Sequence, residues 1–408
     1  MSLQAEAGRS RPDFTLFVPP EGESGVERNN MHLVVTPLPD GVFLATWTQA
    51  SEPHGPDQRV VVARSRDRGR TWSAPEVIDG PEPGTENIAS WSMLVPVPGG
   101  RVYCLYHKNT GVVDYDRAMT GVLAWRCSGD GGRTWGERFQ APIGRGAVDH
   151  SDSSVPGNWV TAGWQHPIAA GSGLILPITR WASREHRFRE GFADQHHEGW
   201  FLRFDNILEE ADPSRLSITT LPRGDRGIRI PSPSDPEVSA AMEPAVQLLS
   251  DGRLVCPLRT VTGSVHYSLS ADLAESWSEP QPLCFQPGGR PVPHPNAPVG
   301  FHRMGDGRFL LLFHNNDGTA NGCSGPLDWK ARRPVYASVG SEIDNPGGQP
   351  LAFTEPGFFY DNGGPERPHA GSLALYGTFF EHDGVRYWWY PDAMRFLLGR
   401  VVQDELVA

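Results

Sequence analysis

Histidine, arginine and carboxylate side chains near the ends of predicted strands are the residues of this sequence that could transfer protons and bind anions. An imidazole exchanges a proton readily near neutral pH. An arginine binds a carboxylate through two parallel hydrogen bonds. Such residues would form a polar site wherever several strands end together. The histidines at predicted strand ends or on turns are His32, His54, His107, His166, His294 and His314.

One predicted hairpin combines an acidic and a basic residue. Glu243 precedes an apolar strand, Asp251-Gly252 forms the turn, and the returning strand ends at Arg259. Another hairpin is predicted to place Trp164-Gln165-His166 beside Thr179-Arg180-Trp181. A carboxylate can accept a proton and a guanidinium can hold an anion, so these hairpins indicate a site for an acidic ligand.

A short motif, S-x-D-x-G-x-x-W, recurs along the chain. It occurs at Ser65–Trp72 and Ser128–Trp135, and at Ser270–Trp277 with Ala274 in place of glycine. The Ser and Asp side chains can bond nearby backbone N–H groups, and the glycine allows a positive φ. The tryptophan can pack back under the turn. The motif therefore predicts a structural turn between two strands.

The spacing of the motif predicts a propeller. The first two copies are 63 residues apart and the next interval is 142 residues, or two units of 71. A further step of about 68 reaches Ser338, in a strand whose motif is lost, and Ser372–Val402 can hold a sixth unit. Apart from a possible short helix at Ile207–Leu216, the units read as alternating strands. We therefore expect an all-β, six-bladed β-propeller of four-stranded antiparallel blades. It forms one domain over residues 1–408, with blades near 25–85, 86–150, 155–225, 238–288, 292–352 and 355–405 and an N-terminal strand near 13–18 that closes the ring.

Composition excludes several partner classes. The chain has 36 basic and 48 acidic residues and a net charge of −12, which argues against nucleic acid and anionic membranes. Its five cysteines show no C-x-x-C spacing, and His196-His197 matches no zinc motif, so we expect no cofactor and no bound metal. The N-terminus lacks the apolar core of a signal peptide, which predicts a cytoplasmic protein and leaves a removed signal as the alternative. The longest irregular stretch, Ser183–Gly199, is a candidate functional loop.

The turn motif and the six units resemble the sialidase (neuraminidase) superfamily, in particular its Asp-box (BNR-repeat) group, over most of the chain. The resemblance implies that Glu243 is the base that activates a tyrosine, and that Arg259 is one of three arginines that hold the substrate carboxylate. Arg333, preferred over Arg332, resembles the third arginine because it stands before Pro334.

The resemblance also implies a nucleophile and an acid. Tyr376 resembles the nucleophilic tyrosine, although glycine follows it where the family has proline, and Tyr360 is its rival. Glu52 resembles the general acid/base on the loop after the first hairpin. His54 and Asp57 are the alternatives on that loop.

The first blade departs from the family pattern. The family's first arginine is replaced by Asn29-Asn30-Met31-His32, and Arg28 stands three positions away. We therefore expect histidines to complete the binding site. The expected substrate-binding set is Arg259, Arg333, His32, His107, His166, Arg180 and His294.

Three functions remain open from the sequence. The first is a sialidase-like glycoside hydrolase acting on an acidic sugar. The second is a polysaccharide lyase that uses His, Tyr and Arg on a uronate-containing glycan, since Arg can neutralise the carboxylate while His or Tyr moves protons. The third is a carbohydrate-binding propeller without catalysis. A carbohydrate is the expected partner in all three.

Overall fold

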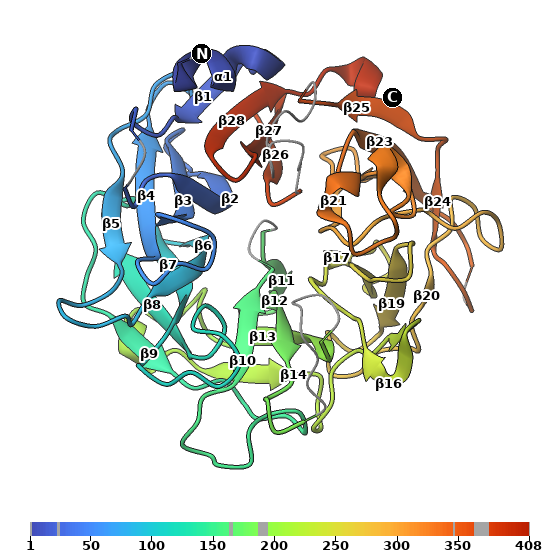
Figure 1. Ribbon diagram of the computed structural model, residues 1–408, viewed down its shortest axis with the longest axis horizontal. Coiled ribbons are helices and arrows are strands. Elements are labelled where there is room, and N and C mark those ends of the chain that lie inside the picture. Colours follow the sequence, from blue (N-terminus) through green and yellow to red (C-terminus); the bar gives the residue numbers. More distant parts are fainter. Residues whose placement is uncertain are drawn as a thin grey trace.

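Six antiparallel sheets surround a central axis in the computed structural model, which describes residues 2–22, 25–162, 166–186, 195–345, 347–362 and 375–407 (Figure 1). We call these sheets blades 1 to 6. Blade 1 contains β2 (Asn29–Pro37), β3 (Phe43–Ala50), β4 (Arg59–Ser65) and β5 (Glu76–Asp79). Blade 2 contains β6 (Ala89–Val97), β7 (Arg101–Lys108), β8 (Val122–Ser128) and β9 (Phe139–Ala141). Blade 3 contains β10 (Asn158–Thr161), β12 (Gly173–Trp181), β13 (His197–Phe204) and β14 (Ile218–Leu221), and β11 (Ile168–Ala170) pairs with β12. Blade 4 contains β17 (Gln247–Leu248), β18 (Leu254–Leu258), β19 (His266–Ser270) and β20 (Gln281–Pro282). Blade 5 contains β21 (Gly300–Arg303), β22 (Phe309–Phe313), β23 (Val335–Glu342) and β24 (Leu351–Phe353), and β25 (Gly357–Tyr360) pairs with β23.

Blade 6 combines segments from distant parts of the sequence. It contains β26 (Thr378–His382), β27 (Val385–Asp392) and β28 (Phe396–Val401), and its outer strand is β1 (Phe14–Phe17). Phe14 pairs with Gly399, and Thr15 with Leu398. The predicted six-bladed, all-β propeller is confirmed, with four-stranded blades as its unit.

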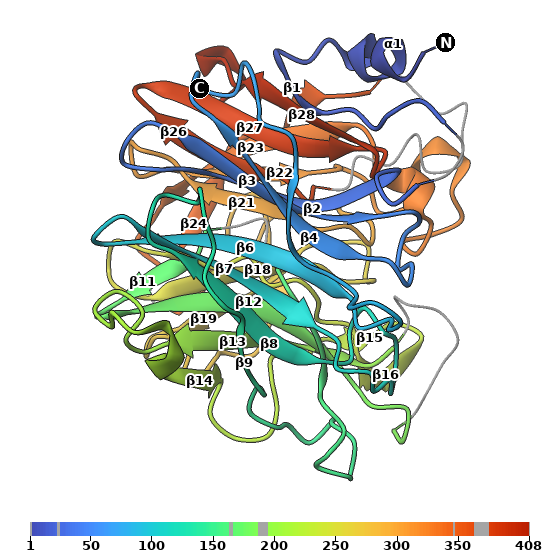
Figure 2. The ribbon, with the colours of Figure 1, turned by 90° about the vertical axis from the view of Figure 1, so that its left-hand side faces the viewer.

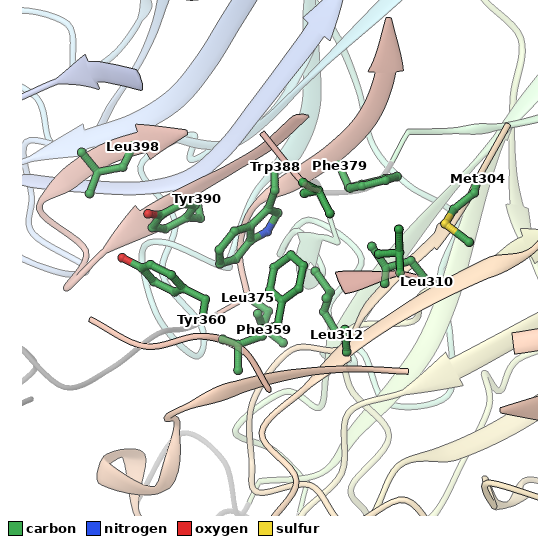
Figure 3. Close-up of a cluster of buried hydrophobic side chains, with 14 of the residues drawn as sticks. Met304, Leu310, Leu312, Phe359, Tyr360, Leu375, Phe379, Trp388, Tyr390 and Leu398 are labelled. Atoms are coloured by element: carbon green, nitrogen blue, oxygen red, sulfur yellow. The ribbon is translucent and has the colours of Figure 1, made fainter. Parts of the chain in front are cut away.

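The core lies between the blades because successive residues of a strand face opposite sides of its sheet. In β3, Ala45 and Trp47 pack toward Trp389 of blade 6, whereas Leu44 packs toward Leu94 of blade 2. Both faces of each blade are therefore buried, and apolar residues fill both. Figure 3 shows one such layer, in which side chains of blade 5 pack against those of blade 6.

The S-x-D turns are held by their own side chains. In the first turn, Ser65 Oγ accepts a hydrogen bond from the Gly69 N–H at 2.8 Å, and Asp67 accepts from the backbone and hydroxyl of Thr71 at 2.8 and 2.6 Å. These bonds lower the pKa of Asp67 to about 2. The turns at Ser128 and Ser270 repeat this arrangement.

Each S-x-D turn also touches the preceding blade. A Cβ atom on Gly69 would lie 2.5 Å from the indole of Trp389, and one on Gly132 would lie 2.8 Å from Leu44. Ala274 occupies the same place in the third copy, also with a positive φ, and is buried among side chains of blade 3. The turns therefore fix the spacing between neighbouring blades.

The structure differs from the sequence-based expectation in a few segments. Ser338 lies within the strand β23, as its spacing predicted, whereas Ile207–Leu216 contains only the 3-10 turn Pro213–Arg215 in place of the possible short helix. A hairpin of β15 (Pro231–Ser232) and β16 (Asp235–Ser239) is inserted between blades 3 and 4, and Figure 2 shows it at the opposite end of the axis from β11. A short α-helix, α1 (Leu3–Ala7), packs its Leu3 and Ala7 onto the core between blades 5 and 6. Within the described residues, no helix has the length and apolar character needed to span a membrane.

Candidate functional site

Glu243, Arg259 and Tyr376 meet in one hydrogen-bonded cluster. Glu243 lies before β17, Arg259 directly follows β18, and Tyr376 lies before β26, so blades 4 and 6 both contribute. The Arg259 guanidinium donates through Nη1 to Glu243 Oε2 at 2.8 Å and to the Tyr376 hydroxyl at 3.1 Å. The Tyr376 hydroxyl donates to Glu243 Oε1 at 3.2 Å. A phenol, a proton acceptor and a cation are therefore in direct contact.

Blade 5 supplies two more members of this cluster, Asn296 and Arg332. Asn296 Oδ1 accepts a hydrogen bond from Arg259 Nε at 2.6 Å. Arg332 is 8% exposed, and its Nε has no hydrogen-bond partner among the described residues. Burial and the neighbouring Arg259 lower the pKa of Arg332 to about 10, while Tyr376 and Glu243 act in the opposite direction. We call Glu243, Arg259, Asn296, Arg332 and Tyr376 the central cluster.

The central cluster carries an excess of positive charge. Glu243 supplies one carboxylate against the two guanidinium groups of Arg259 and Arg332, and all three side chains are buried. Burial raises the pKa of Tyr376, and Glu243 raises it further, while the two arginines lower it. In this low-dielectric setting an unbalanced cation favours the binding of an anion.

His32 and Trp91 form an aromatic wall beside the central cluster. Their rings stack with centroids 3.5 Å apart, and the His32 ring meets that of Tyr376 edge-on at 5.5 Å. Burial, and then the nearby His54, lower the pKa of His32 well below its usual value, so its imidazole is neutral at pH 7. The indole Nε1 of Trp91 is a second buried donor with no hydrogen-bond partner in the described part of the chain.

The backbone presents His32, Trp91 and Glu243 in the same unusual conformation. Their φ angles are 58°, 54° and 44°, in the left-handed region that residues other than glycine avoid. The pairing of β2 with β3 shifts register next to His32, and that of β6 with β7 shifts next to Trp91, which marks a β-bulge in each first strand. Bulges and positive φ angles turn side chains out of the regular alternation and cluster at functional sites.

The loop after β3 places His54 rather than Glu52 beside a partner. His54 Nδ1 lies 3.8 Å from Asp116 Oδ1, which belongs to blade 2. Glu52 is exposed. Asp57 accepts hydrogen bonds from the Ser51 N–H at 3.2 Å and so shapes the loop itself. Of the three candidate acids on this loop, His54 is the one that contributes to the lowered pKa of His32.

Arg333 lies outside the central cluster, although the sequence favoured it over Arg332. Its guanidinium forms a two-fold ion pair with Asp361, at 2.9 and 2.6 Å. Adjacent residues of an extended segment point in opposite directions, so only one of the two arginines can face Tyr376. That residue is Arg332. The rival tyrosine, Tyr360, packs against Trp388 and Tyr390 between blades 5 and 6.

Three of the other expected binding residues, Arg180, His107 and His294, have local polar partners, whereas His166 Nε2 has no hydrogen-bond partner among the described residues. Arg180 forms a buried ion pair with Asp149 at 2.8 Å. His107 Nε2 is bonded to the carbonyl of Met119 at 2.8 Å. Burial lowers the pKa of His107, His166 and His294 to about 4 in each case. His294 also lies close enough to Arg259 and Arg332 for their charges to contribute to the lowering of its pKa. Trp164, Gln165 and residues 187–194 of the loop expected at Ser183–Gly199 lie outside the described residues.

Sequence reasoning missed Trp91, Asn296 and Asp116 as site residues. One signal was available for Trp91. His32 stands eight residues before Asp40 in the first predicted turn, and Trp91 stands eight residues before Gly99 in the corresponding turn of the next unit. An alignment of the units with one another would have paired the two positions.

A separate cavity of about 480 Å³ lies between the inserted β15–β16 hairpin and the Glu275–Pro280 turn. Its arginines are Arg223, which pairs with Glu275, and Arg226 and Arg229, which lie 4.0 and 3.6 Å from the buried Glu198. Their charges are therefore largely balanced within the protein. In the described part of the chain, no group of three or more His, Cys, Asp or Glu side chains could hold a metal ion.

Comparisons with known proteins agree with this architecture. The model of the family described as "BNR repeat-like domain" matches residues 41–345. A structure called Hadza microbial sialidase Hz136 superposes with a TM-score of 0.62 at 14% identity, over 95% of this chain and 69% of that one. The intramolecular trans-sialidase of Ruminococcus gnavus superposes with a TM-score of 0.56 at 15% identity, over 94% of this chain and 98% of that one.

Two further comparisons set limits on the likeness. Trypanosoma rangeli sialidase superposes with a TM-score of 0.57 at 15% identity over 97% of this chain, which spans only 58% of that protein. No curated protein sequence matches this chain. At such identities the structural likeness concerns the fold alone. The match of the family model over most of the sequence places the chain in the BNR repeat-like domain family, and its propeller is sialidase-like.

Proposed function

We propose that this protein is a glycoside hydrolase that acts on a carboxylate-bearing sugar, with Tyr376 as the nucleophile. The observation that carries this proposal is the direct contact of the Tyr376 hydroxyl with both Glu243 and Arg259. A buried phenol is a weak nucleophile while protonated, so it needs a proton acceptor within hydrogen-bond distance. Glu243 is that acceptor.

The first step moves one proton and one glycosidic bond. Glu243 accepts the Tyr376 proton as the phenolic oxygen attacks the anomeric carbon, and the bond to the leaving oxygen breaks. His54, in its protonated form beside Asp116, gives a proton to that oxygen. In the second step water attacks the anomeric carbon and gives a proton to His54. Tyr376 then leaves and recovers its proton from Glu243.

The charge of the central cluster supports an acidic substrate. Arg259 and Arg332 outnumber Glu243, and the unpartnered Nε of Arg332 offers a donor that a carboxylate oxygen can accept from. An arginine fork holds a carboxylate with two charge-assisted hydrogen bonds. The solved sialidases that share this fold give independent support for an acidic sugar.

The test is turnover of aryl sialosides and aryl uronides by four proteins: the wild type, Tyr376→Phe, Glu243→Gln and Tyr360→Phe. We expect at least a 1,000-fold loss of kcat in Tyr376→Phe and a loss of about 10²–10⁴-fold in Glu243→Gln. Tyr360→Phe is the matched control, because this buried tyrosine packs against Trp388 and Tyr390 rather than within the central cluster, and it should keep kcat within a few-fold. Full activity in both Tyr376→Phe and Glu243→Gln would contradict the assignment. A wild type that binds acidic sugars and never cleaves them would be a binding propeller.

A polysaccharide lyase is the second candidate, and the contact between neutral His32 and Tyr376 favours it. A neutral imidazole or a phenolate can abstract the α-proton of a uronate whose carboxylate the two arginines hold. The product of such a reaction is an unsaturated uronide that absorbs in the ultraviolet. An absorbance rise with uronate polymers, lost in both His32→Gln and Tyr376→Phe, would establish the lyase and exclude the hydrolase.

A further inference from the structure

The backbone of Glu243 is bonded to a side chain of the neighbouring blade, that of Thr179. The neighbours of Glu243 in sequence are fixed within blade 4: Met242 exchanges two hydrogen bonds of 3.0 Å with Arg259, and the Ala245 N–H donates to the Pro257 carbonyl at 2.8 Å. The Glu243 N–H instead donates to Thr179 Oγ1, at 2.7 Å, on strand β12 of blade 3. Thr179 and Glu243 are both fully or almost fully buried.

This hydrogen bond coincides with backbone strain. The φ of Glu243 is 44°, in the left-handed region that a residue with a Cβ adopts only under strain. Such a conformation persists only where its surroundings impose it. The Thr179 hydroxyl is the polar group that meets the strained peptide directly.

The same arrangement occurs at the aromatic wall. The Trp91 N–H donates to Thr48 Oγ1 of the preceding blade at 3.0 Å, and the φ of Trp91 is 54°. Trp91 and Glu243, two of the three positive-φ residues described at the site, are therefore bonded through their N–H to a threonine of the neighbouring blade. This repetition separates the arrangement from an isolated contact.

We propose that Thr179 is a positioning residue that sets the direction of the Glu243 carboxylate toward Tyr376. This inference rests on the proposed function, because it assigns Glu243 as the proton acceptor. Without the Thr179 hydroxyl the Glu243 peptide relaxes toward an ordinary extended conformation, and its carboxylate moves relative to the phenol. A displacement of about 1 Å lowers the rate of a positioned reaction by about 100-fold. The substrate carboxylate is held by Arg259 and Arg332, so its binding is largely unaffected.

The experiment compares Thr179→Val, which removes the hydroxyl, with Thr179→Ser, which keeps it. We expect kcat to fall at least 10-fold in Thr179→Val with KM within about three-fold of the wild type, and to recover to within three-fold in Thr179→Ser. The matched control is Thr220→Val on β14 of the same blade, where Thr220 Oγ1 accepts the Gly144 N–H at 2.8 Å away from the site. Thr220→Val should keep kcat. Wild-type kcat in Thr179→Val, or equal losses in Thr179→Val and Thr220→Val, would overturn the inference.

A second measurement keeps the inference separate from the proposed function. Hydrogen exchange of the peptide that contains Glu243, followed by mass spectrometry, reports the Thr179 bond whether or not a substrate is turned over. Exchange at this amide should accelerate at least 10-fold in Thr179→Val and remain slow in Thr179→Ser. Unchanged protection in Thr179→Val would overturn the positioning role. Another outcome is a wild type that cleaves no substrate while the Glu243 amide is protected from exchange in Thr179→Ser and unprotected in Thr179→Val. That result would contradict the hydrolase proposal and still confirm that Thr179 holds the Glu243 backbone.

Discussion

At the scale of single residues, Arg332 and Arg333 show how neighbouring side chains of one type come to differ. Arg332 is buried, and burial and the neighbouring Arg259 lower its pKa to about 10 against the opposing effect of Tyr376 and Glu243, whereas Arg333 pairs with Asp361. Sequence reasoning found this pair and favoured the wrong-facing member. Nothing in the order of the residues fixes which of two adjacent side chains points inward, because one step along an extended segment reverses the direction.

Substitutions of the two arginines should differ in their effect on ligand binding. Arg332→Ala should weaken the binding of a carboxylated inhibitor about 10–100-fold, since one charge-assisted pair contributes about 1.5–3 kcal/mol. Arg333→Ala should leave the affinity within about two-fold. Isothermal titration calorimetry with the same inhibitor measures both. Equal affinities in the two variants would show that Arg332 does not hold the carboxylate.

At the scale of elements, the turns were predictable from the sequence and the bulges were not. The Ser and Asp of each S-x-D turn act on backbone groups within a few residues, so the pattern is visible locally. The positive φ angles of His32, Trp91 and Glu243 depend on bonds to other strands and blades, such as that of Trp91 to Thr48. A local pattern carries no trace of such partners. The blade count therefore followed from the sequence, whereas the direction of the site residues did not.

The first S-x-D turn gives a stability test of this view. Gly69→Ala places a Cβ 2.5 Å from the buried Trp389 and also strains a φ of 87°. We expect it to lower the free energy of unfolding by about 3 kcal/mol, the sum of backbone strain and overpacking. Denaturant unfolding followed by tryptophan fluorescence measures the change.

Gly131→Ala is the matched control for Gly69→Ala. Gly131 has a φ of 69°, and its added Cβ would meet only Leu38, at an ordinary contact distance of 3.7 Å. In this variant only the backbone strain should lower the free energy of unfolding, by about 1 kcal/mol. Equal losses in the two variants would mean that the contact with Trp389 does not set the spacing of blades 1 and 6.

At the scale of the whole molecule, pH should act on stability through Asp392 at the end of β27. Asp392 is 1% exposed, and burial raises its pKa to about 6, with Glu6 and Asp361 adding to the shift and Asn362 and Arg9 opposing it. The folded protein therefore binds a proton at Asp392 more tightly than the unfolded chain does. This contribution is fully present below about pH 4 and is lost as pH rises through about 6, a change of about 2–3 kcal/mol.

Asp392→Asn tests that effect because the amide is neutral at every pH and can still accept the hydrogen bond from Asn362, now 2.9 Å. The variant should unfold at a higher denaturant concentration than the wild type at pH 7.5 and at the same concentration at pH 4. Asp344→Asn, at an exposed position, serves as the control and should unfold at the same denaturant concentration as the wild type at both pH values. A variant less stable than the wild type at pH 7.5 would show that the ionised Asp392 is stabilising.

The pairing of β1 with β28 also determines when the site can exist during synthesis. Strand β1 leaves the ribosome early, and its partner ends at Val401, so blade 6 stays incomplete until almost every described residue has been translated. Tyr376 belongs to that last blade, and Glu243 precedes it by 133 positions. A nascent or prematurely terminated chain that stops before Tyr376 therefore lacks the tyrosine–carboxylate contact, whatever its earlier blades do. A reaction that needs this contact is therefore confined to chains whose translation has passed Tyr376.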